Sequence, residues 1–265
     1  MSTLNLAIHG AAGRMGKRLI ALGSADPGVN LVAALESPKH PQLAADAGEL
    51  AGVGRINLPL TATIDTKIDA LIDFSSPEGA EAAIKLCSER GIPLVMATTG
   101  LSEAAKDHLR IASQTIPVVW SPSMSTAVNL TMKLCAIAGE VLKNLPSGCD
   151  VEIIERHHRF KEDAPSGTAL KFGDIIAGVM GQQQHVHGRE GKTGQRQLGE
   201  IGYHAVRTGD NPGEHTIIFG MLGETIELNV KASNRDCYAL GAIEAAKFVA
   251  QQKPGMYSMY DVLGL

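Results

Sequence analysis

The chain has 265 residues, of which 44% are hydrophobic and 20% are charged, and its formal net charge is −4. This length and composition exclude wholesale disorder and indicate a globular protein with two modest domains. The slightly negative charge gives no reason to expect nucleic acid or an acidic membrane as a partner.

The four cysteines stand far apart and form no CxxC pair. A zinc cluster or a disulfide framework is therefore disfavoured, and reduced core cysteines are expected. The first residues, MSTLNLAIHG, contain no basic segment and no long apolar stretch, which is unlike a signal peptide. No run in the sequence approaches a membrane span, so we expect a cytoplasmic protein.

The first part of the chain alternates short apolar runs with helical patterns. The apolar runs are residues 4–9, 31–36, 69–74, 93–98 and 117–120. Helical patterns follow Gly16 and cover residues 77–90 and 102–113. This alternation predicts an α/β fold with a Rossmann-type, doubly wound parallel sheet.

The pattern changes after residue 126. The sequence predicts helices at 127–145 and 166–180 and strands at 150–156, 201–208, 214–221 and 224–233. Residues 182–199 are polar, glycine-rich and without periodicity, which predicts a long loop. We expect a second, α+β domain with a mostly open mixed sheet at residues 127–235. A helix at 238–251 resembles those of the first part, so residues 236–265 are expected to rejoin residues 1–126.

The segment GAAGRMG, residues 10–16, follows the first predicted strand and opens a helix. Gly10 would allow a tight turn, Gly13 would let the backbone approach a pyrophosphate, and Gly16 would let the helix pack on the strand. Glu36 ends the second predicted strand, twenty residues after Gly16, where an acid can bind the adenosine ribose. The spacing predicts a dinucleotide-binding domain.

The kind of dinucleotide is less clearly specified. Glu36 favours the free 2′-hydroxyl of NADH, and Ser37 beside it is neutral. Arg14 and Lys39 could reach a 2′-phosphate, although Lys39 could equally be a solvated loop lysine. Two further turns, ATTG at 97–100 and SPSMS at 121–125, follow strands of the predicted sheet. Ligands of open α/β sheets collect at such carboxyl ends of strands.

The segment ERHHRFKEDAPSGTAL, residues 155–170, carries the second candidate site. His157 and Lys161 are expected to be neighbours in a strand or a helix, whereas His158 would point elsewhere in a strand. Metal binding is disfavoured because adjacent histidines on opposite faces make a poor pair of ligands. A lysine beside a histidine favours a neutral imidazole, which suits proton transfer. Taken alone, the charged segment could equally be a solvent-exposed strand end without a catalytic role.

The residues after this segment indicate an anion site. Ser166 is a predicted N-cap, and the N–H groups of Gly167 and Thr168 would be unpaired at the start of a helix. Together with Lys161 and His158, these groups would hold a carboxylate or a phosphate. The residues alone therefore indicate a reductase that acts on a small anionic substrate.

Three motifs together resemble the 4-hydroxy-tetrahydrodipicolinate reductase family over essentially the whole chain. They are GAAGRMG, E-x-HH-x-x-K-x-DAPSGTAL, and RTGDNPGEHT with KASNR. The resemblance implies hydride transfer from NADH or NADPH to a cyclic unsaturated dicarboxylate, in the diaminopimelate route to lysine. It also implies a homotetramer built through the substrate-binding domains.

The resemblance assigns roles to individual residues. His157 matches the family's proton donor and Lys161 its second catalytic residue. The substrate-binding residues would be His158, Ser166, Gly167, Thr168 and, more weakly, Arg235. The cofactor-binding residues would be Gly10, Ala11, Ala12, Gly13, Arg14, Met15, Gly16, Glu36, Lys39, Ala97, Thr98, Thr99, Ser121, Pro122, Ser123 and Met124.

Three departures from the family pattern concern the cofactor. Ser37 replaces a basic residue, ATTG replaces GTTG, and SPSMS replaces a segment with Asn-Phe. We therefore expect both NADH and NADPH to be used. Two alternatives are another dehydrogenase of similar build, such as an aspartate-semialdehyde or homoserine dehydrogenase, and a non-catalytic dinucleotide sensor. The phosphorylating semialdehyde enzyme would need a nucleophilic cysteine, for which Cys135 and Cys149 show no motif.

Overall fold

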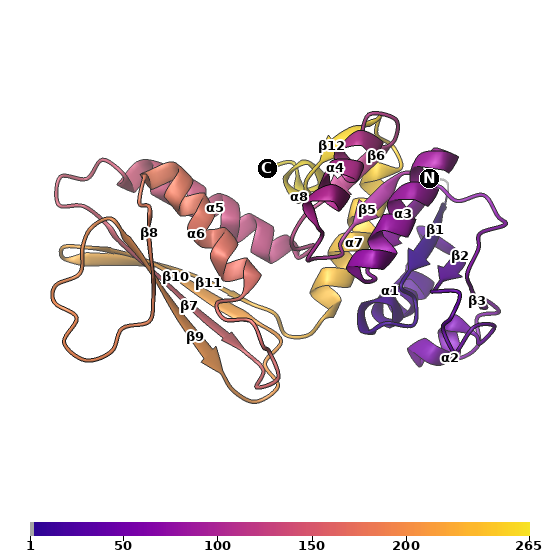
Figure 1. The fold of residues 1–265 in the computed structure, drawn as a ribbon, viewed down its shortest axis with the longest axis horizontal. Coiled ribbons are helices and arrows are strands. Elements are labelled where there is room, and N and C mark those ends of the chain that lie inside the picture. The colour runs from indigo at the N-terminus through magenta and orange to yellow at the C-terminus, as the bar shows by residue number, and fades with distance from the viewer. Residues whose placement is uncertain (1–2) are drawn as a thin grey trace. The chain divides into compact units, whose positions relative to one another are not determined.

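The computed structural model describes residues 3–265 of the chain (Figure 1). It divides into two compact units, one formed by the chain up to Thr126 together with Arg235–Leu265, the other by Ala127–Asn234. Within residues 3–265, no helix combines the length and the apolar character that crossing a bilayer requires.

The first unit contains a seven-stranded sheet in which every neighbouring pair is parallel. Its strands are β1 (Leu4–His9), β2 (Val29–Leu35), β3 (Leu60–Thr61), β4 (Ala70–Asp73), β5 (Leu94–Met96), β6 (Pro117–Trp120) and β12 (Gly255–Tyr257). The spatial order is β12-β6-β5-β4-β1-β2-β3, so the direction of winding reverses between β1 and β4. This confirms the predicted Rossmann-type sheet.

Helices cover both faces of this sheet. They are α1 (Arg14–Ala25), α2 (Ala47–Ala51), α3 (Pro77–Arg90), α4 (Glu103–Ala112), α7 (Asp236–Val249) and α8 (Met259–Leu263). Leu6 and Ile8 of β1 belong to one buried cluster, which includes residues of α1 and α7. Ala7 belongs to a second cluster with residues of α3 and α4. Because successive side chains of a strand point to opposite faces, β1 contributes to both cores.

The second unit is a five-stranded mixed sheet with two helices. Its elements are α5 (Thr126–Leu142), β7 (Asp150–His157), α6 (Gly167–Met180), β8 (Gln184–His187), β9 (Glu200–Arg207), β10 (Glu214–Met221) and β11 (Glu224–Lys231). The order is β11-β10-β7-β9-β8, with β7, β9 and β8 parallel and β10 antiparallel to both of its neighbours. Figure 1 shows α5 and α6 along one face of this sheet, which leaves the other face open.

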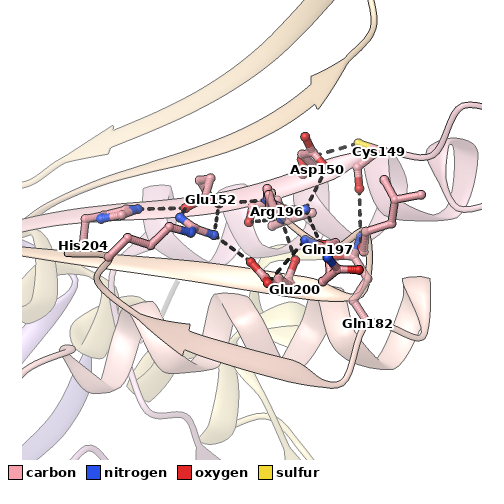
Figure 2. Close-up of polar contacts among 11 residues, drawn as sticks. Cys149, Asp150, Glu152, Gln182, Arg196, Gln197, Glu200 and His204 are labelled. Carbon is pink, nitrogen blue, oxygen red and sulfur yellow. Dashed lines mark hydrogen bonds and ion pairs between the residues drawn. The ribbon is translucent and has the colours of Figure 1, made fainter. Parts of the chain in front are cut away.

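The prediction of a continuous loop at 182–199 was wrong in part. Residues 184–187 form the edge strand β8, and the rings of His185 and His187 both stack on Tyr203 of β9. An edge strand held by polar aromatic contacts lacks the apolar alternation on which the prediction depended. The irregular remainder is also anchored, since Arg196 pairs with Asp150 and Glu152 of β7 (Figure 2).

Candidate functional site

The glycine loop lies between β1 and α1, at the carboxyl edge of the first sheet. Gly10 has φ +77°, and a Cβ there would lie 2.5 Å from the Phe74 carbonyl oxygen. A Cβ on Gly16 would lie 2.1 Å from the Gly10 carbonyl oxygen, so α1 packs directly on the loop. The structure therefore requires glycine at both positions for the reasons expected from the sequence.

Glu36 follows β2 and faces this loop. Its Oε1 accepts a hydrogen bond from the Ala12 backbone N–H at 2.9 Å, and its Oε2 accepts one from the Ser37 N–H at 3.2 Å. Ser37 and Lys39 are exposed beyond it, and Arg14 is exposed at the start of α1. The acid and the glycine loop are thus brought together within one unit.

A buried carboxylate that the sequence reading missed joins three strand ends. Asp73, the last residue of β4, is fully buried and contacts His9 Nδ1 at 2.6 Å. It also accepts hydrogen bonds from the hydroxyls of Ser75 at 2.7 Å and Thr98 at 2.6 Å. The sequence did contain a signal for this cluster. His9, Asp73 and Thr98 each end or follow a strand, and these strands are parallel neighbours in the sheet. This network holds the turns that carry the cofactor candidates.

Not every predicted cofactor-binding residue has a side chain that is available to contact a ligand. Ala11 and Met124 are buried in the core, so only their backbone could contact a ligand. The Thr98 hydroxyl is engaged with Asp73, and the Ser121 hydroxyl donates to the Ser123 carbonyl at 2.8 Å. Thr99 and Pro122 are exposed in the same two turns.

In the second unit, His157 is the last residue of β7 and is 8% exposed. Its Nδ1 lies 2.5 Å from Oε2 of Glu155, a fully enclosed carboxylate that is 1% exposed. Lys161 instead pairs with Asp163, with its Nζ 2.7 and 2.9 Å from the two carboxylate oxygens. The charged group bonded to His157 is therefore Glu155, which shares its strand face, and no contact between His157 and Lys161 is present among the described residues.

Glu155 is held in its ionised form. Burial opposes ionisation, but hydrogen bonds from His157 and Arg207 outweigh it and lower the pKa of Glu155 to about 2. Arg207 of β9 donates to both carboxylate oxygens at 2.8 Å. Sequence reasoning missed both residues, although the i, i+2 spacing of Glu155 and His157 was a usable signal.

The start of α6 has the backbone arrangement that the sequence predicted for an anion cradle. Ser166 caps the helix by accepting from the Ala169 N–H at 3.1 Å. The N–H groups of Gly167 and Thr168 make no hydrogen bond among the described residues, and a Cβ on Gly167 would meet no protein atom within 4 Å. Two backbone donors at a helix N-terminus, next to open space, are suited to an anionic ligand.

A second histidine missed from the sequence supports this cradle. His215 of β10 is 5% exposed, and its Nε2 lies 3.0 Å from the Ser166 hydroxyl. Its ring meets that of His157 edge-on, with centroids 5.3 Å apart. Burial, reinforced by the nearby His157 and Lys161, lowers the pKa of His215 to about 4, so this ring is neutral at physiological pH.

His158 and Arg235 complete the predicted substrate set. The His158 Nδ1 is buried and has no hydrogen-bond partner among the described residues. A buried polar atom without a partner is costly, so it marks a place where a ligand atom could bind. Arg235 belongs to the first unit, next to the start of α7, and its assignment to substrate stays a prediction.

The cysteines do not provide a nucleophile for the semialdehyde alternative. Burial raises the pKa of Cys135 to about 12 and also raises the pKa of Cys149. A nucleophilic cysteine requires the opposite shift, because the thiolate is the reactive form.

A parallel sheet with a glycine loop and an acid after its second strand, joined to a unit with an anion cradle, defines a two-unit dinucleotide-dependent oxidoreductase. Family models described as "Dihydrodipicolinate reductase, N-terminus" and "Dihydrodipicolinate reductase, C-terminus" match residues 4–124 and 127–263. The chain belongs to the dihydrodipicolinate reductase family.

Individual relatives agree with this. The chain is 56% identical to a 4-hydroxy-tetrahydrodipicolinate reductase of Rhodopirellula baltica, over 99% of this chain and 96% of the relative. It is 47% identical to one of Alkalilimnicola ehrlichii, over 99% and 100%. Among solved structures, a dipicolinate-bound dihydrodipicolinate reductase from Paenisporosarcina shares the fold, with a TM-score of 0.78, 24% identity and 98% of each chain covered.

Proposed function

We propose that this chain reduces 4-hydroxy-tetrahydrodipicolinate, or the dihydrodipicolinate formed from it by loss of water, to tetrahydrodipicolinate with NAD(P)H, in the diaminopimelate route to lysine. The observation that carries the proposal is the link from His157 through Glu155 to Ser166 at the start of α6, inside the unit that matches the family's C-terminal model. The first unit serves as the dinucleotide-binding domain and the second as the substrate-binding domain.

The substrate has two carboxylates, which need at least two cationic or N–H donor sites. The Gly167 and Thr168 N–H groups provide one, and Lys161 and His158 provide the other. Lys161 is held at the site by Asp163, and it would exchange part of that contact for a substrate carboxylate. Arg235 is a further candidate for carboxylate binding.

His157 supplies the proton. NAD(P)H, when bound, supplies a hydride to a ring carbon of the substrate. Electron density moves toward the ring nitrogen, and His157 gives up a proton to complete the addition. A substrate in the hydroxylated form also loses its hydroxyl group as water. Its Nδ1 faces Glu155, whereas its Nε2 makes no hydrogen bond among the described residues, so Nε2 is the atom that would donate.

The cofactor site consists of the glycine loop, Glu36 and the two turns after β5 and β6. We propose that both NADH and NADPH are used. The Glu36 carboxylate suits a ribose with a free 2′-hydroxyl, and Ser37 offers no cation for a 2′-phosphate. Arg14 and Lys39, both exposed, can partly offset the repulsion.

A homotetramer formed through the second units is part of the same proposal. The sheet face that α5 and α6 leave uncovered carries exposed apolar side chains, including Ile154 of β7 and Val206 of β9. Because Val206 pairs with Arg156, two residues after Ile154, both lie on one face of the sheet. Such a face is suited to an interface between copies of the chain. The cytoplasmic location stays a prediction from the sequence.

The test is oxidation of NADH, followed by absorbance, when the purified protein is given substrate made in situ by the synthase that precedes it. Turnover supports the proposal, and a His157→Gln control separates enzymatic from background oxidation. A protein that binds NADH but does not oxidise it with this substrate would be the dinucleotide sensor instead.

A further inference from the structure

The Glu155 carboxylate joins three elements of the second unit at one buried point. Besides His157 on its own strand, it contacts Arg207 of β9 through two hydrogen bonds of 2.8 Å. Its Oε1 also accepts from the Ser166 backbone N–H at 3.1 Å, at the cap of α6. One side chain, 1% exposed, therefore links the histidine to the helix that carries the anion cradle.

This contact determines which nitrogen of His157 carries a fixed proton. An ionised carboxylate only accepts hydrogen bonds, so His157 must donate from Nδ1 in both its neutral and its charged form. The second proton of the charged form then resides on Nε2. The negative charge of Glu155 therefore acts on the Nδ1 side of the ring.

Other charges modify this effect. The groups facing the pair are Arg207 from β9, His215 from β10, and Lys161 and Asp163 from the segment after β7. Lys161 and Asp163 form their own ion pair, and His215 is neutral at physiological pH. Arg207 shares the carboxylate with His157, so it limits how strongly the negative charge acts on the ring.

We propose that Glu155 is the positioning residue of the proton donor: it orients His157 through Nδ1 and leaves Nε2 to carry the proton that is donated, while Arg207 shares the carboxylate. The role in turnover depends on the proposed function of His157 as the proton donor. When His157 releases the Nε2 proton to the substrate, it becomes a neutral imidazole that still donates its Nδ1–H to Glu155. Solvent then restores the Nε2 proton.

The chain contains a matched control on the same strand. Glu152, three residues before Glu155 on β7, accepts hydrogen bonds from Arg189, Arg196 and His204 (Figure 2). Its pKa is also lowered to about 2, because hydrogen bonds from these residues outweigh its burial. It has no contact with His157 among the described residues. Glu152→Gln therefore removes an equivalent ion-paired carboxylate without touching the proton donor.

The experiment is a pH titration of the His157 ring by NMR in the full-length protein without substrate or cofactor. The signal is identified by its loss in His157→Gln. In Glu155→Gln the midpoint should move to lower pH, because the charged acceptor of the Nδ1–H is lost. In Arg207→Gln it should move to higher pH, and in Glu152→Gln it should stay where it is in the wild type.

The high-pH limb of kcat/KM should move in the same directions, with the substrate KM changed less than kcat. Opposite shifts from two residues that bind each other are not expected from mere loosening of the fold. A wild-type midpoint in Glu155→Gln, or shifts of the same sign in both variants, would overturn the proposal. If Glu155→Gln does not fold, Arg207→Gln decides alone. The absence of an upward shift of the midpoint in Arg207→Gln would then overturn the proposal. Because the titration needs no turnover, absence of reductase activity would count only against the proposed function.

Discussion

The Glu36 carboxylate accepts a hydrogen bond from the Ala12 backbone N–H at 2.9 Å, which ties the end of β2 to the glycine loop. A negative charge is thereby held beside the backbone that would cradle a dinucleotide. The same carboxylate can accept hydrogen bonds from ribose hydroxyls, and it repels a 2′-phosphate.

We expect kcat/KM for NADH and NADPH to lie within about tenfold of each other, a difference of about 1.4 kcal/mol. Exposed cations such as Arg14 and Lys39 contribute about 1 kcal/mol or less, which offsets only part of the repulsion by Glu36. The measurement is steady-state turnover with each cofactor at saturating substrate. Ser37→Arg should shift the ratio toward NADPH. A wild-type preference for NADPH of about a hundredfold or more would contradict this prediction.

His157→Gln should retain the fold and NADH affinity but lose turnover by about a hundredfold or more, because the proton donor is removed. Unfolding temperature, NADH binding by fluorescence and kcat should be measured on the same preparation. The glutamine amide can still donate to Glu155, so the surrounding hydrogen bonds have a replacement. Turnover close to that of the wild type would exclude His157 as the donor.

Lys161→Ala should raise the substrate KM and lower kcat, since a charge-assisted contact to a carboxylate disappears. The matched control is Lys192→Ala, which removes an exposed loop lysine of the same unit and should change neither constant. The KM for NADH should stay the same in both variants. An effect confined to that cofactor constant would assign Lys161 to the dinucleotide instead.

The Glu152 network predicts a specific dependence of stability on pH. The pKa of Glu152 is lowered from 4.5 to about 2 in the folded protein. Its contribution is therefore fully present above about pH 4.5 and is lost as the pH falls toward about 2. Urea unfolding should show that the stability difference between the wild type and Glu152→Gln shrinks over this range. A difference independent of pH would show that the ion pairs do not contribute as described.

Gly173 of α6 should resist replacement by alanine, because a Cβ there would lie 1.7 Å from the Tyr203 hydroxyl oxygen. That hydroxyl is hydrogen-bonded to His185 at 2.7 Å, so Gly173→Ala would also disturb β8. We expect a loss of about 1–3 kcal/mol in the free energy of unfolding. Gly178→Ala, in the same helix with no nearby atom, should instead be stabilising by up to about 1 kcal/mol. Equal effects of the two substitutions would contradict the argument.

Local patterns in the sequence determined much of this protein. Alternating apolar runs and helical segments specify the parallel sheet, since burial on both faces leaves little other choice for such strands. The glycines of the first loop and the cap at Ser166 act through backbone geometry within a few residues, so they could be read in advance. The family resemblance had the same origin, in short motifs with fixed spacing.

Tertiary structure alone decided what surrounds those motifs. Arg207 lies 52 residues from Glu155 along the chain, and only the pairing of β7 with β9 brings its guanidinium onto that carboxylate. The pairing of β7 with β10 likewise delivers His215 to Ser166. Charge and burial at a side chain depend on neighbours from other strands, and a linear pattern does not specify which strands become neighbours. The sequence therefore indicated the histidine, whereas the fold determined the arginine and the second histidine that surround it.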